Sequence, residues 1–314
     1  MRDLVELVRG PAALSVPGDA LAGAAAAGGL GPRTAGLAAA SVCLYWAGMA
    51  ANDWADSELD AKERPERPVP SGRVAPGTAF RAAAGLTASG VALAGLAGGR
   101  RALAVAVPLA GAVWAYDTTL KDTALGPAAM AACRGLDVLL GASTGSTARL
   151  RRAAVPALTV AAHTYTVTAL SRREVSGADP VLPAVTLAGT AAIAISATLP
   201  RPIATTLPRR GQRAALARRH QRAASPTRHR QQWWRRLLTA ALAGWYGMSY
   251  GIPQARAIDE PSAGNVRTAV GAGITGLPAL QGALIARAGA PGRGVAVATA
   301  APVGRHLAKR FSPT

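Results

Sequence analysis

The chain is poor in aromatic, charged and cysteine residues, and each shortage narrows the classes of protein it can belong to. Aromatic residues make up 4% of its 314 residues and charged residues 16%, where a quarter is usual. Half of the residues are apolar, and they are mainly Ala, Val and Leu alongside abundant Gly. Small side chains of this kind favour closely packed helices over a sheet core. The composition predicts an all-α integral membrane protein.

The two cysteines and the N-terminus exclude two further features. Cys43 and Cys133 lie within apolar stretches, and neither has a second Cys or a His at metal-ligand spacing. We expect both to be small buried residues. The N-terminal sequence MRDLVELVRG carries acidic residues and lacks a compact apolar run with a small-residue cleavage site. A removable signal peptide is therefore not expected.

Lysine is also scarce, although the chain is strongly basic. Only three lysines accompany a large excess of arginine, and the formal net charge is +19. Clustered arginine can bind nucleic acid through its phosphates, but no nucleic-acid recognition module accompanies it here. Loops beside an anionic membrane surface explain the excess better. We expect the lipid bilayer, and no nucleic acid, as a partner.

Uncharged or nearly uncharged segments recur at about the 20-residue length that crosses a bilayer. About nine are present, with a weaker tenth near 288–304. They cover residues 11–30, 34–51, 78–99, 102–116, 124–146, 153–171, 180–200, 237–255 and 266–287. The pattern predicts a polytopic transmembrane helical bundle, with residues 1–314 forming one membrane-embedded domain. Residues 208–232 lack an apolar period and predict a disordered basic loop within it.

The alternation of spans predicts which connections share a face. If the N-terminus is cytoplasmic, the connections at 52–77, 117–123 and 171–180 all lie on the cytoplasmic side. Residues 201–236 hold eleven arginines and no acidic residue, yet the same count places them outside. That placement conflicts with the positive-inside rule, which long loops obey poorly.

A row of carboxylates follows the second apolar segment, in the sequence NDWADSELDAKERPERPVPSG over residues 52–72. Six of the sixteen acidic residues fall between Asp53 and Glu66. Asn52, Asp53, Asp56 and Asp60 are spaced by about three and four residues, so a helix places them on one face. Such a row can hold Mg²⁺ while water and a substrate phosphate complete its coordination.

Two arginines follow the row and sharpen its interpretation. Arg64 and Arg67 can clamp the oxygens of a phosphate. The competing interpretation is a solvated helix end whose charges face water. We favour a metal-diphosphate site, because the row opens directly from an uncharged segment of membrane-spanning length.

Ionisable residues also occur beside and inside later apolar segments. The sequence AYDTTLKDT places Tyr116, Asp117 and Lys121 just after a span, where a lysine can neutralise a diphosphate leaving group. The alternative for Lys121 is a positive-inside anchor. Arg134 and Asp137 stand three residues apart within a span, so they either face a polar cavity or neutralise each other.

Two other features have ordinary structural explanations. His163 can act as a general base or hydrogen-bond donor to a substrate, but a satisfied polar residue between helices is the favoured interpretation. Gly271, Gly273 and Gly276 match the dinucleotide-binding pattern GxGxxG. Because no predicted strand precedes them and no acidic residue follows, we expect close helix packing there instead.

The carboxylate row and the residues after it resemble the first aspartate-rich signature of the UbiA superfamily of membrane prenyltransferases. Residues 52–60 reproduce the form NDxxDxxxD, and residues 67–72 reproduce the downstream RPxPSG; family members also commonly carry Tyr and Lys in the loop of residues 116–121. The resemblance implies nine helices in a bacterial cytoplasmic membrane and a site facing the cytoplasm. It also implies Mg²⁺-dependent transfer of an isoprenoid group from a prenyl diphosphate to a small, aromatic acceptor. Its implied metal ligands are Asp53, Asp56 and Asp60, and its implied catalytic residues are Asp53, Asp56 and Lys121. We expect Asn52, Arg64, Arg67 and Tyr116 to bind substrate, together with Arg134, Arg172 and Glu174, which are candidates by their position and not by the family motif.

The second aspartate-rich motif of that family is missing in recognisable form. Ser171, Arg172, Arg173 and Glu174 occupy its place, and Asp179 is the only aspartate nearby. Glu174 can serve as a lone metal ligand, and Arg172 can replace a metal's charge. The sequence TALSRREVSG is similar to that of the EboC-like subgroup encoded in bacterial secondary-metabolite clusters. The alternative function is therefore a non-catalytic UbiA-like protein that binds or helps export an isoprenoid or secondary metabolite.

Overall fold

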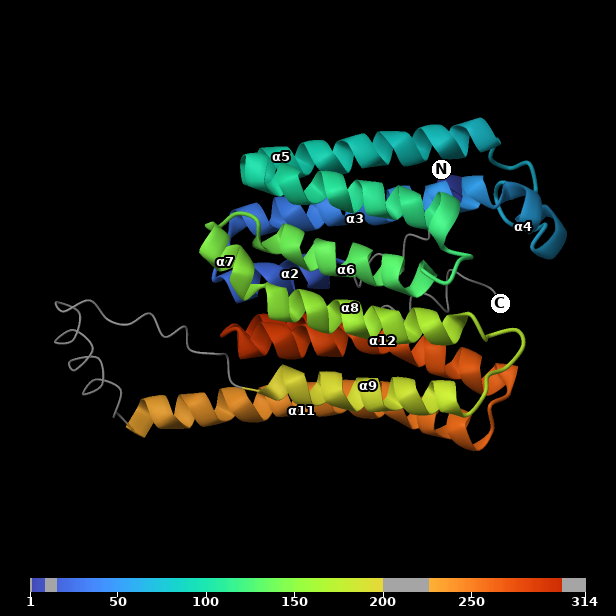
Figure 1. The fold of residues 1–314 in the computed structure, drawn as a ribbon. Helices are drawn as coiled ribbons and strands as arrows, with labels where there is room; N and C mark the ends of the chain where they lie inside the picture. The colour runs from blue at the N-terminus through green and yellow to red at the C-terminus, as the bar shows by residue number, and fades with distance from the viewer. Residues whose placement is uncertain (1, 9–15, 200–225, 301–314) are drawn as a thin grey trace.

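Parallel and antiparallel helices form an elongated bundle in the computed structural model, which describes residues 2–8, 16–199 and 226–300 (Figure 1). No strand occurs within these ranges, so the all-α prediction is confirmed. The first half of the bundle contains α1 (Arg2–Leu7), α2 (Pro17–Ala27), α3 (Pro32–Ala55), α4 (Ser57–Glu63), α5 (Pro76–Ala115), the π-helical turn η2 (Tyr116–Leu120) and α6 (Gly126–Ala142). The second half contains α7 (Thr147–Arg152), α8 (Ala154–Ser171), α9 (Val181–Thr198), α11 (Pro226–Asp259) and α12 (Ala263–Arg287). Residues 291–300 are also helical.

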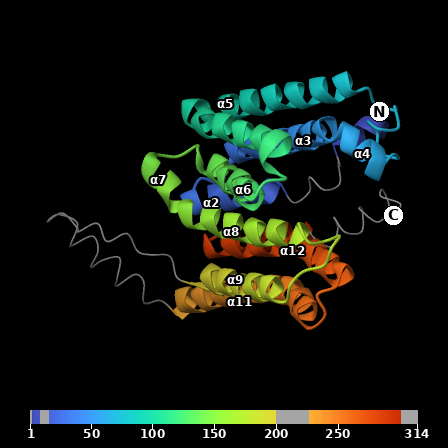
Figure 2. The same ribbon diagram turned by 45° about the vertical axis from the view of Figure 1, so that its right-hand side comes forward.

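Each predicted apolar segment lies on one of these helices within the described ranges. By length and composition, four of the described helices can cross a membrane: Pro32–Ala55, Pro76–Leu120, Val181–Thr198 and Ala263–Arg287. The central helices α2 and α6 lie between α3 and α5 on one side and α8, α9, α11 and α12 on the other (Figure 2).

Helix α5 contains two of the predicted spans and reverses between them. Gly99 adopts the left-handed φ of 67°, which a residue with a Cβ rarely adopts. The two halves then run back along each other, and Trp114 Nε1 donates a hydrogen bond of 3.0 Å to Thr87 Oγ1. The Trp114 ring also contacts Phe80, with ring centroids 5.9 Å apart. The predicted segments 78–99 and 102–116 are therefore antiparallel neighbours.

Glycines allow α2 and α6 to pack with their backbones in close approach. A Cβ built on Gly23 of α2 would lie 1.7 Å from the carbonyl oxygen of Val138. One built on Gly141 of α6 would lie 1.9 Å from the carbonyl oxygen of Ala20. Membrane helices use small residues for such contacts. The approach brings the polar residues of α2 against those of α6.

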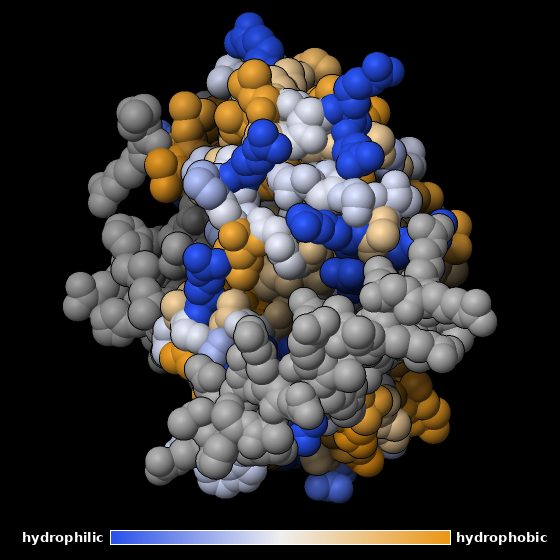
Figure 3. All heavy atoms as spheres, turned by 90° about the vertical axis from the view of Figure 1, so that its left-hand side faces the viewer, coloured by the Kyte–Doolittle hydropathy of each residue, from blue (hydrophilic) through white to orange (hydrophobic). Residues whose placement is uncertain are grey.

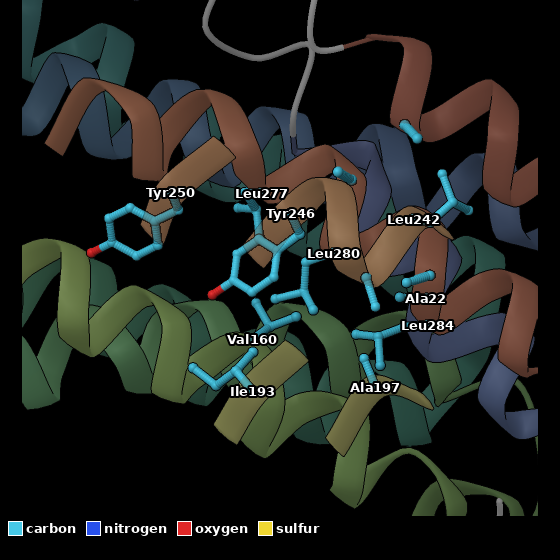
Figure 4. Close-up of a cluster of buried hydrophobic side chains, with 14 of the residues drawn as sticks. Ala22, Val160, Ile193, Ala197, Leu242, Tyr246, Tyr250, Leu277, Leu280 and Leu284 are labelled. Carbon is cyan, nitrogen blue, oxygen red and sulfur yellow. The ribbon is translucent and has the colours of Figure 1, made fainter. Parts of the chain in front are cut away.

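The second half of the bundle has a large apolar core between α8, α9, α11 and α12. Tyr246 of α11, Leu280 of α12 and Ile193 of α9 converge there (Figure 4). His163 of α8 also lies in this core, and its Nδ1 is 3.0 Å from the hydroxyl of Tyr246. His163 is thus held between helices, as the favoured interpretation predicted.

The connections at 52–77, 117–123 and 171–180 lie together at one end of the bundle, as predicted (Figure 1). Helix α9 ends and α11 begins at the opposite end. Of the predicted loop, residues 208–225 lie outside the described residues. Its predicted end at 232 is wrong, because α11 begins at Pro226. Proline suits the first helical position, and the Arg and Gln residues that follow are good helix formers.

Candidate functional site

The carboxylate row lies where α3 passes into α4. Asp53 belongs to the last turns of α3 and is 3% exposed, and Asp60 of α4 is 2% exposed. Asp56 lies between the two helices, and its amide continues the turn by donating to the Asn52 carbonyl at 2.9 Å. Carboxylates buried to this degree require a cation or several hydrogen bonds.

Arg67 supplies that cation for two members of the row. Its Nη1 lies 2.5 Å from Oδ2 of Asp60 and 3.6 Å from Oδ1 of Asp53. Arg64 is farther away, with Nη1 at 4.0 Å from Oδ1 of Asp60, and its side chain is 53% exposed. The two aspartates therefore converge on one guanidinium group, while Arg64 remains largely in solvent.

The RPxPSG segment folds into a compact turn that positions Arg67. The Ser71 hydroxyl donates a hydrogen bond of 2.6 Å to the Arg67 carbonyl. Gly72 has a φ of 75°, and its amide donates to the Val69 carbonyl at 3.1 Å. Val74 then closes the turn by donating to the Pro68 carbonyl at 2.8 Å. The positive φ explains why the turn contains glycine.

Lys121 reaches the row from a distant part of the chain. Its Nζ contacts Oδ1 of Asp56, and Asn52 Nδ2 donates a hydrogen bond of 3.1 Å to Oδ2 of the same carboxylate. The π-helical turn η2 immediately precedes Lys121, and the Lys121 amide donates to the Tyr116 carbonyl at 3.0 Å. Such turns are frequent at functional sites. This one directs Lys121 to the row and buries Asp117.

An apolar cavity of about 100 Å³ opens beside these residues. Most ligand pockets hold roughly 300–1,000 Å³, so the cavity is narrow. The residues that line it are Val16, Ser41, Leu44, Tyr45, Gly48, Met49, Leu109, Val113, Tyr116, Asp117, Met130, Cys133, Arg134 and Asp137. The predicted residues Tyr116 and Arg134 therefore lie on its wall.

Arg134 does not form an ion pair with Asp137, so mutual neutralisation, one of the two interpretations left open, is wrong; both residues line the cavity, as the other interpretation required. Nε of Arg134 lies 2.9 Å from Oδ2 of Asp19 on α2. Asp137 instead accepts a hydrogen bond of 2.6 Å from the Ser41 hydroxyl of α3. Gln281 of α12 donates to Oδ1 of Asp19 at 2.7 Å. Sequence reasoning missed Asp19, although it is the only charged residue in the segment 11–30.

The UbiA prenyltransferase family matches residues 17–199, which include the carboxylate row, Lys121 and the cavity-lining residues after Val16. The chain belongs to the UbiA prenyltransferase family. The resemblance drawn from the sequence is thereby confirmed.

Curated UbiA relatives share sequence with part of this chain. Over 151 residues, the chain is 39% identical to the digeranylgeranylglyceryl phosphate synthase of Methanopyrus kandleri. This match covers 46% of the chain and 54% of the relative. Over 125 residues, the chain is 38% identical to the synthase of the same name from Ignicoccus hospitalis. This match covers 40% of the chain and 41% of the relative. The matches thus extend over about half the length of these relatives.

Solved structures share the UbiA fold over most of the chain. A UbiA homologue from Aeropyrum pernix K1 superposes with a TM-score of 0.59 at 18% identity, covering 92% of this chain and 98% of that one. A structure described as a digeranylgeranylglyceryl phosphate synthase in membranes gives a TM-score of 0.61 at 15% identity, covering 91% and 97%. The likeness confirms the predicted fold of a membrane-embedded helical bundle.

Residues 171–174, which stand where the second UbiA motif is missing, include two arginines. Nη1 of Arg172 donates to the carbonyl of Thr123, and it lies 3.4 Å from that of Lys121, so it ties the end of α8 to the connection holding Lys121. Burial raises the pKa of Glu174, and the nearby charges of Arg267 and Arg64 partly offset the rise. Among the described hydrogen bonds and ion pairs, none joins Glu174 to the carboxylate row.

The UbiA fold implies Mg²⁺, and the carboxylates can be tested for their fit to it. In the described part of the chain, no three His, Cys, Asp or Glu residues are grouped as a metal cage. Mg²⁺ commonly uses only one or two protein carboxylates together with water and substrate phosphates. Asp53 and Asp60 already converge on one cationic nitrogen of Arg67, so this pair fits that role. Asp56, the third predicted ligand, is turned toward Lys121 instead.

Proposed function

We propose that this chain is an integral-membrane prenyltransferase that transfers an isoprenoid group from a prenyl diphosphate to a small acceptor with the help of Mg²⁺. The observation that carries the proposal is the contact of Lys121 with Asp56 beside the pair Asp53 and Asp60. It brings carboxylates and cations together near an apolar cavity, whose lining includes Tyr116 and Asp117 of η2. This is the combination that a diphosphate with an apolar tail requires.

In the proposed mechanism, Asp53 and Asp60 hold Mg²⁺, and Arg67 and Lys121 turn from the carboxylates to the diphosphate oxygens. When bound, the metal neutralises negative charge on the leaving group. Arg64, which is largely exposed, approaches the same group from solvent. The apolar wall of the cavity keeps water from the allylic carbon as positive charge develops there. As the carbon–oxygen bond breaks, the diphosphate leaves and a nucleophilic atom of the acceptor bonds to the allylic carbon, while the acceptor gives up one proton, which a diphosphate oxygen can accept.

The relatives' names suggest a donor class but do not identify the acceptor. A digeranylgeranylglyceryl phosphate contains geranylgeranyl groups, so a twenty-carbon prenyl diphosphate is the donor to test first. The side chains of Leu44, Leu109 and Val113 line the cavity, and we expect the prenyl tail to contact this apolar wall.

The proposal is tested by the binding of a non-hydrolysable geranylgeranyl diphosphate analogue to the purified protein in nanodiscs, with and without Mg²⁺. We expect Mg²⁺-dependent binding to the wild type and its loss in Asp53→Asn. Asp259→Asn makes the same change at an exposed residue at the end of α11 and should bind normally. A folded wild type that binds no diphosphate would instead support the non-catalytic alternative, which the missing second motif favours.

We also propose that the end carrying the carboxylate row faces the cytoplasm, where a water-soluble diphosphate head is supplied. The end of α9 and the start of α11 would then lie at the outer face, although the positive-inside rule favours the cytoplasm for the arginine-rich sequence 201–236. Ser71→Cys at one end and Ser146→Cys at the other report the orientation through labelling by an impermeant maleimide. Labelling of Ser71→Cys from outside intact cells would reverse the proposed orientation.

A further inference from the structure

A buried polar cluster lies at the inner end of the cavity, away from the carboxylate row. It comprises Asp19, Arg134, Asp137 and Ser41, from α2, α6 and α3. The cavity passes Gly48, where a Cβ would lie 3.3 Å from Oδ2 of Asp117. Ser41 precedes Gly48 by seven residues on α3, which corresponds to about 10 Å along the helix. The cluster therefore lies at depth within the bundle.

Among the described residues, three side-chain atoms of this cluster are buried without a hydrogen-bond partner. Oδ2 of Asp19 lies in the ion pair with Nε of Arg134, which leaves Oδ1 of Asp137 and Nη2 of Arg134. Asp137 is only 5% exposed, and both residues line the cavity. A buried polar atom without a partner is costly, so a molecule within the cavity is expected to satisfy both atoms. One atom accepts a hydrogen bond and the other donates one.

The charges of the cluster limit the kind of molecule that fits. Arg134 is the only Lys, Arg or His among the described residues lining the cavity, and Asp19 already pairs with it. A carboxylate or phosphate would therefore bring negative charge beside Asp137 without a cation to balance it. A hydroxyl group adds no charge, and it can accept from Nη2 while donating to Oδ1.

We infer that Arg134 and Asp137 bind a hydroxyl group of an alcohol or phenol at the inner end of the cavity. The rest of that molecule extends along the apolar wall toward Asp117 and the carboxylate row. The inference rests on the proposed function in one respect, since it assigns the hydroxyl to the acceptor rather than to the prenyl tail. It predicts selection for a neutral hydroxyl and against an anionic head.

Three matched probes test this selection on the wild-type protein in nanodiscs, without Mg²⁺ or prenyl diphosphate. The probes are 4-propylphenol, 4-propylanisole and 4-propylbenzoate, and titration calorimetry is corrected with empty nanodiscs. The anisole keeps the oxygen acceptor but cannot donate to Asp137. We expect one phenol to bind per chain, and the anisole and benzoate to bind roughly tenfold more weakly or worse. The inference would be overturned if the anisole or the benzoate bound as tightly as the phenol, or if the phenol did not bind.

A variant pair then assigns the selection to the cluster. Asp137→Leu removes the accepting oxygen with little change in volume, and we expect the preference for phenol over anisole to fall to about one. Asp259→Leu, at an exposed position, should retain it. A preference that survives Asp137→Leu would assign the two atoms to ordered water. If Asp137→Leu does not fold, the wild-type comparison still decides the inference, and the diphosphate-binding test addresses the proposed function separately.

Discussion

The arginines at the two ends of the bundle have different partners. At the end with the carboxylate row, Arg67 contacts two aspartates and Arg73 contacts Asp3 and Glu6. At the opposite end, no carboxylate accompanies the arginines of the described residues. Hydrophilic residues are spread over that face (Figure 3). The arginines there are Arg33, Arg100, Arg101, Arg149, Arg151, Arg152, Arg235, Arg236, Arg287 and Arg293.

At the arginine end, the described hydrogen bonds of the guanidinium groups go to backbone carbonyls. Arg101 Nη1 donates to the Gly145 carbonyl just beyond α6 at 2.7 Å, and Arg287 Nη1 donates to the Ser196 carbonyl near the end of α9 at 2.9 Å. Cations are favourable at helix C-termini, and exposed ones attract anionic lipid headgroups. The comparison shows that pairing with carboxylates, rather than positive charge itself, distinguishes the candidate site.

The largest expected effect comes from removing one carboxylate of the converging pair. Asp53→Asn keeps the shape of the side chain but removes the charge that would hold Mg²⁺. We expect prenyl transfer to fall on the order of a hundredfold or more, as when one charge-stabilising group is lost from an active site. Turnover of geranylgeranyl diphosphate with a panel of alcohol and phenol acceptors measures it. Unchanged turnover in a folded Asp53→Asn protein would remove the row from the mechanism.

Replacing Lys121, which follows η2 and contacts Asp56, should reduce prenyl transfer less. Lys121→Met leaves the stem of the side chain but cannot neutralise a diphosphate oxygen. We expect kcat/KM for the diphosphate to fall about tenfold, a loss of about 1.4 kcal/mol. Lys121→Arg should recover part of it, because the charge returns with a different geometry. If Lys121→Met and wild type have the same kcat/KM, Lys121 is only a membrane anchor.

The carboxylate row and the RPxPSG segment predicted the family, and the composition and the recurring apolar segments predicted the helical fold. The spacing of the row could not predict how it divides, because Arg67 and Lys121 reach the carboxylates through a turn and through a contact 65 residues apart in sequence. Helical periodicity places side chains on a face but does not choose their partners on other helices. Asp56 illustrates that limit: its spacing grouped it with Asp53 and Asp60, but its carboxylate contacts Lys121.

The pairing inside the bundle shows the same limit more clearly. An ion pair between Arg134 and Asp137 was one of the two interpretations left open, because they are three residues apart on one helix. The backbone contact between α2 and α6, which Gly23 and Gly141 permit, brings Asp19 to Arg134 instead. An isolated charge in an apolar segment was the available signal for Asp19. Its partner depends on packing that the sequence alone did not reveal.

At the arginine end, we expect a change in stability without a change in activity. Arg101→Met removes the hydrogen bond to the Gly145 carbonyl and a cation close to the end of α6. The free energy of unfolding should fall by about 1 kcal/mol. Unfolding of the reconstituted protein measures this change, and turnover should equal that of the wild type. A loss of turnover with unchanged stability would show that the two ends are not functionally separate.

The smallest expected effect concerns the exposed contacts between Arg73 and α1. The hydrogen bond from Arg73 holds the pKa of Glu6 below its ordinary value of 4.5, so the ionised form favours the docked helix. The stabilisation is present above that ordinary value and is lost as pH falls through the lowered pKa. A spin label at the exposed position Val5→Cys should become mobile in this acidic range.

Adding Glu6→Gln should weaken the dependence on pH, whereas adding Glu66→Gln should preserve it, because only the backbone carbonyl of Glu66 binds Arg73. Since these contacts lie in solvent, salt should weaken them at neutral pH. A mobility independent of pH, salt and Glu6 would show that α1 is held by burial of Leu7 alone.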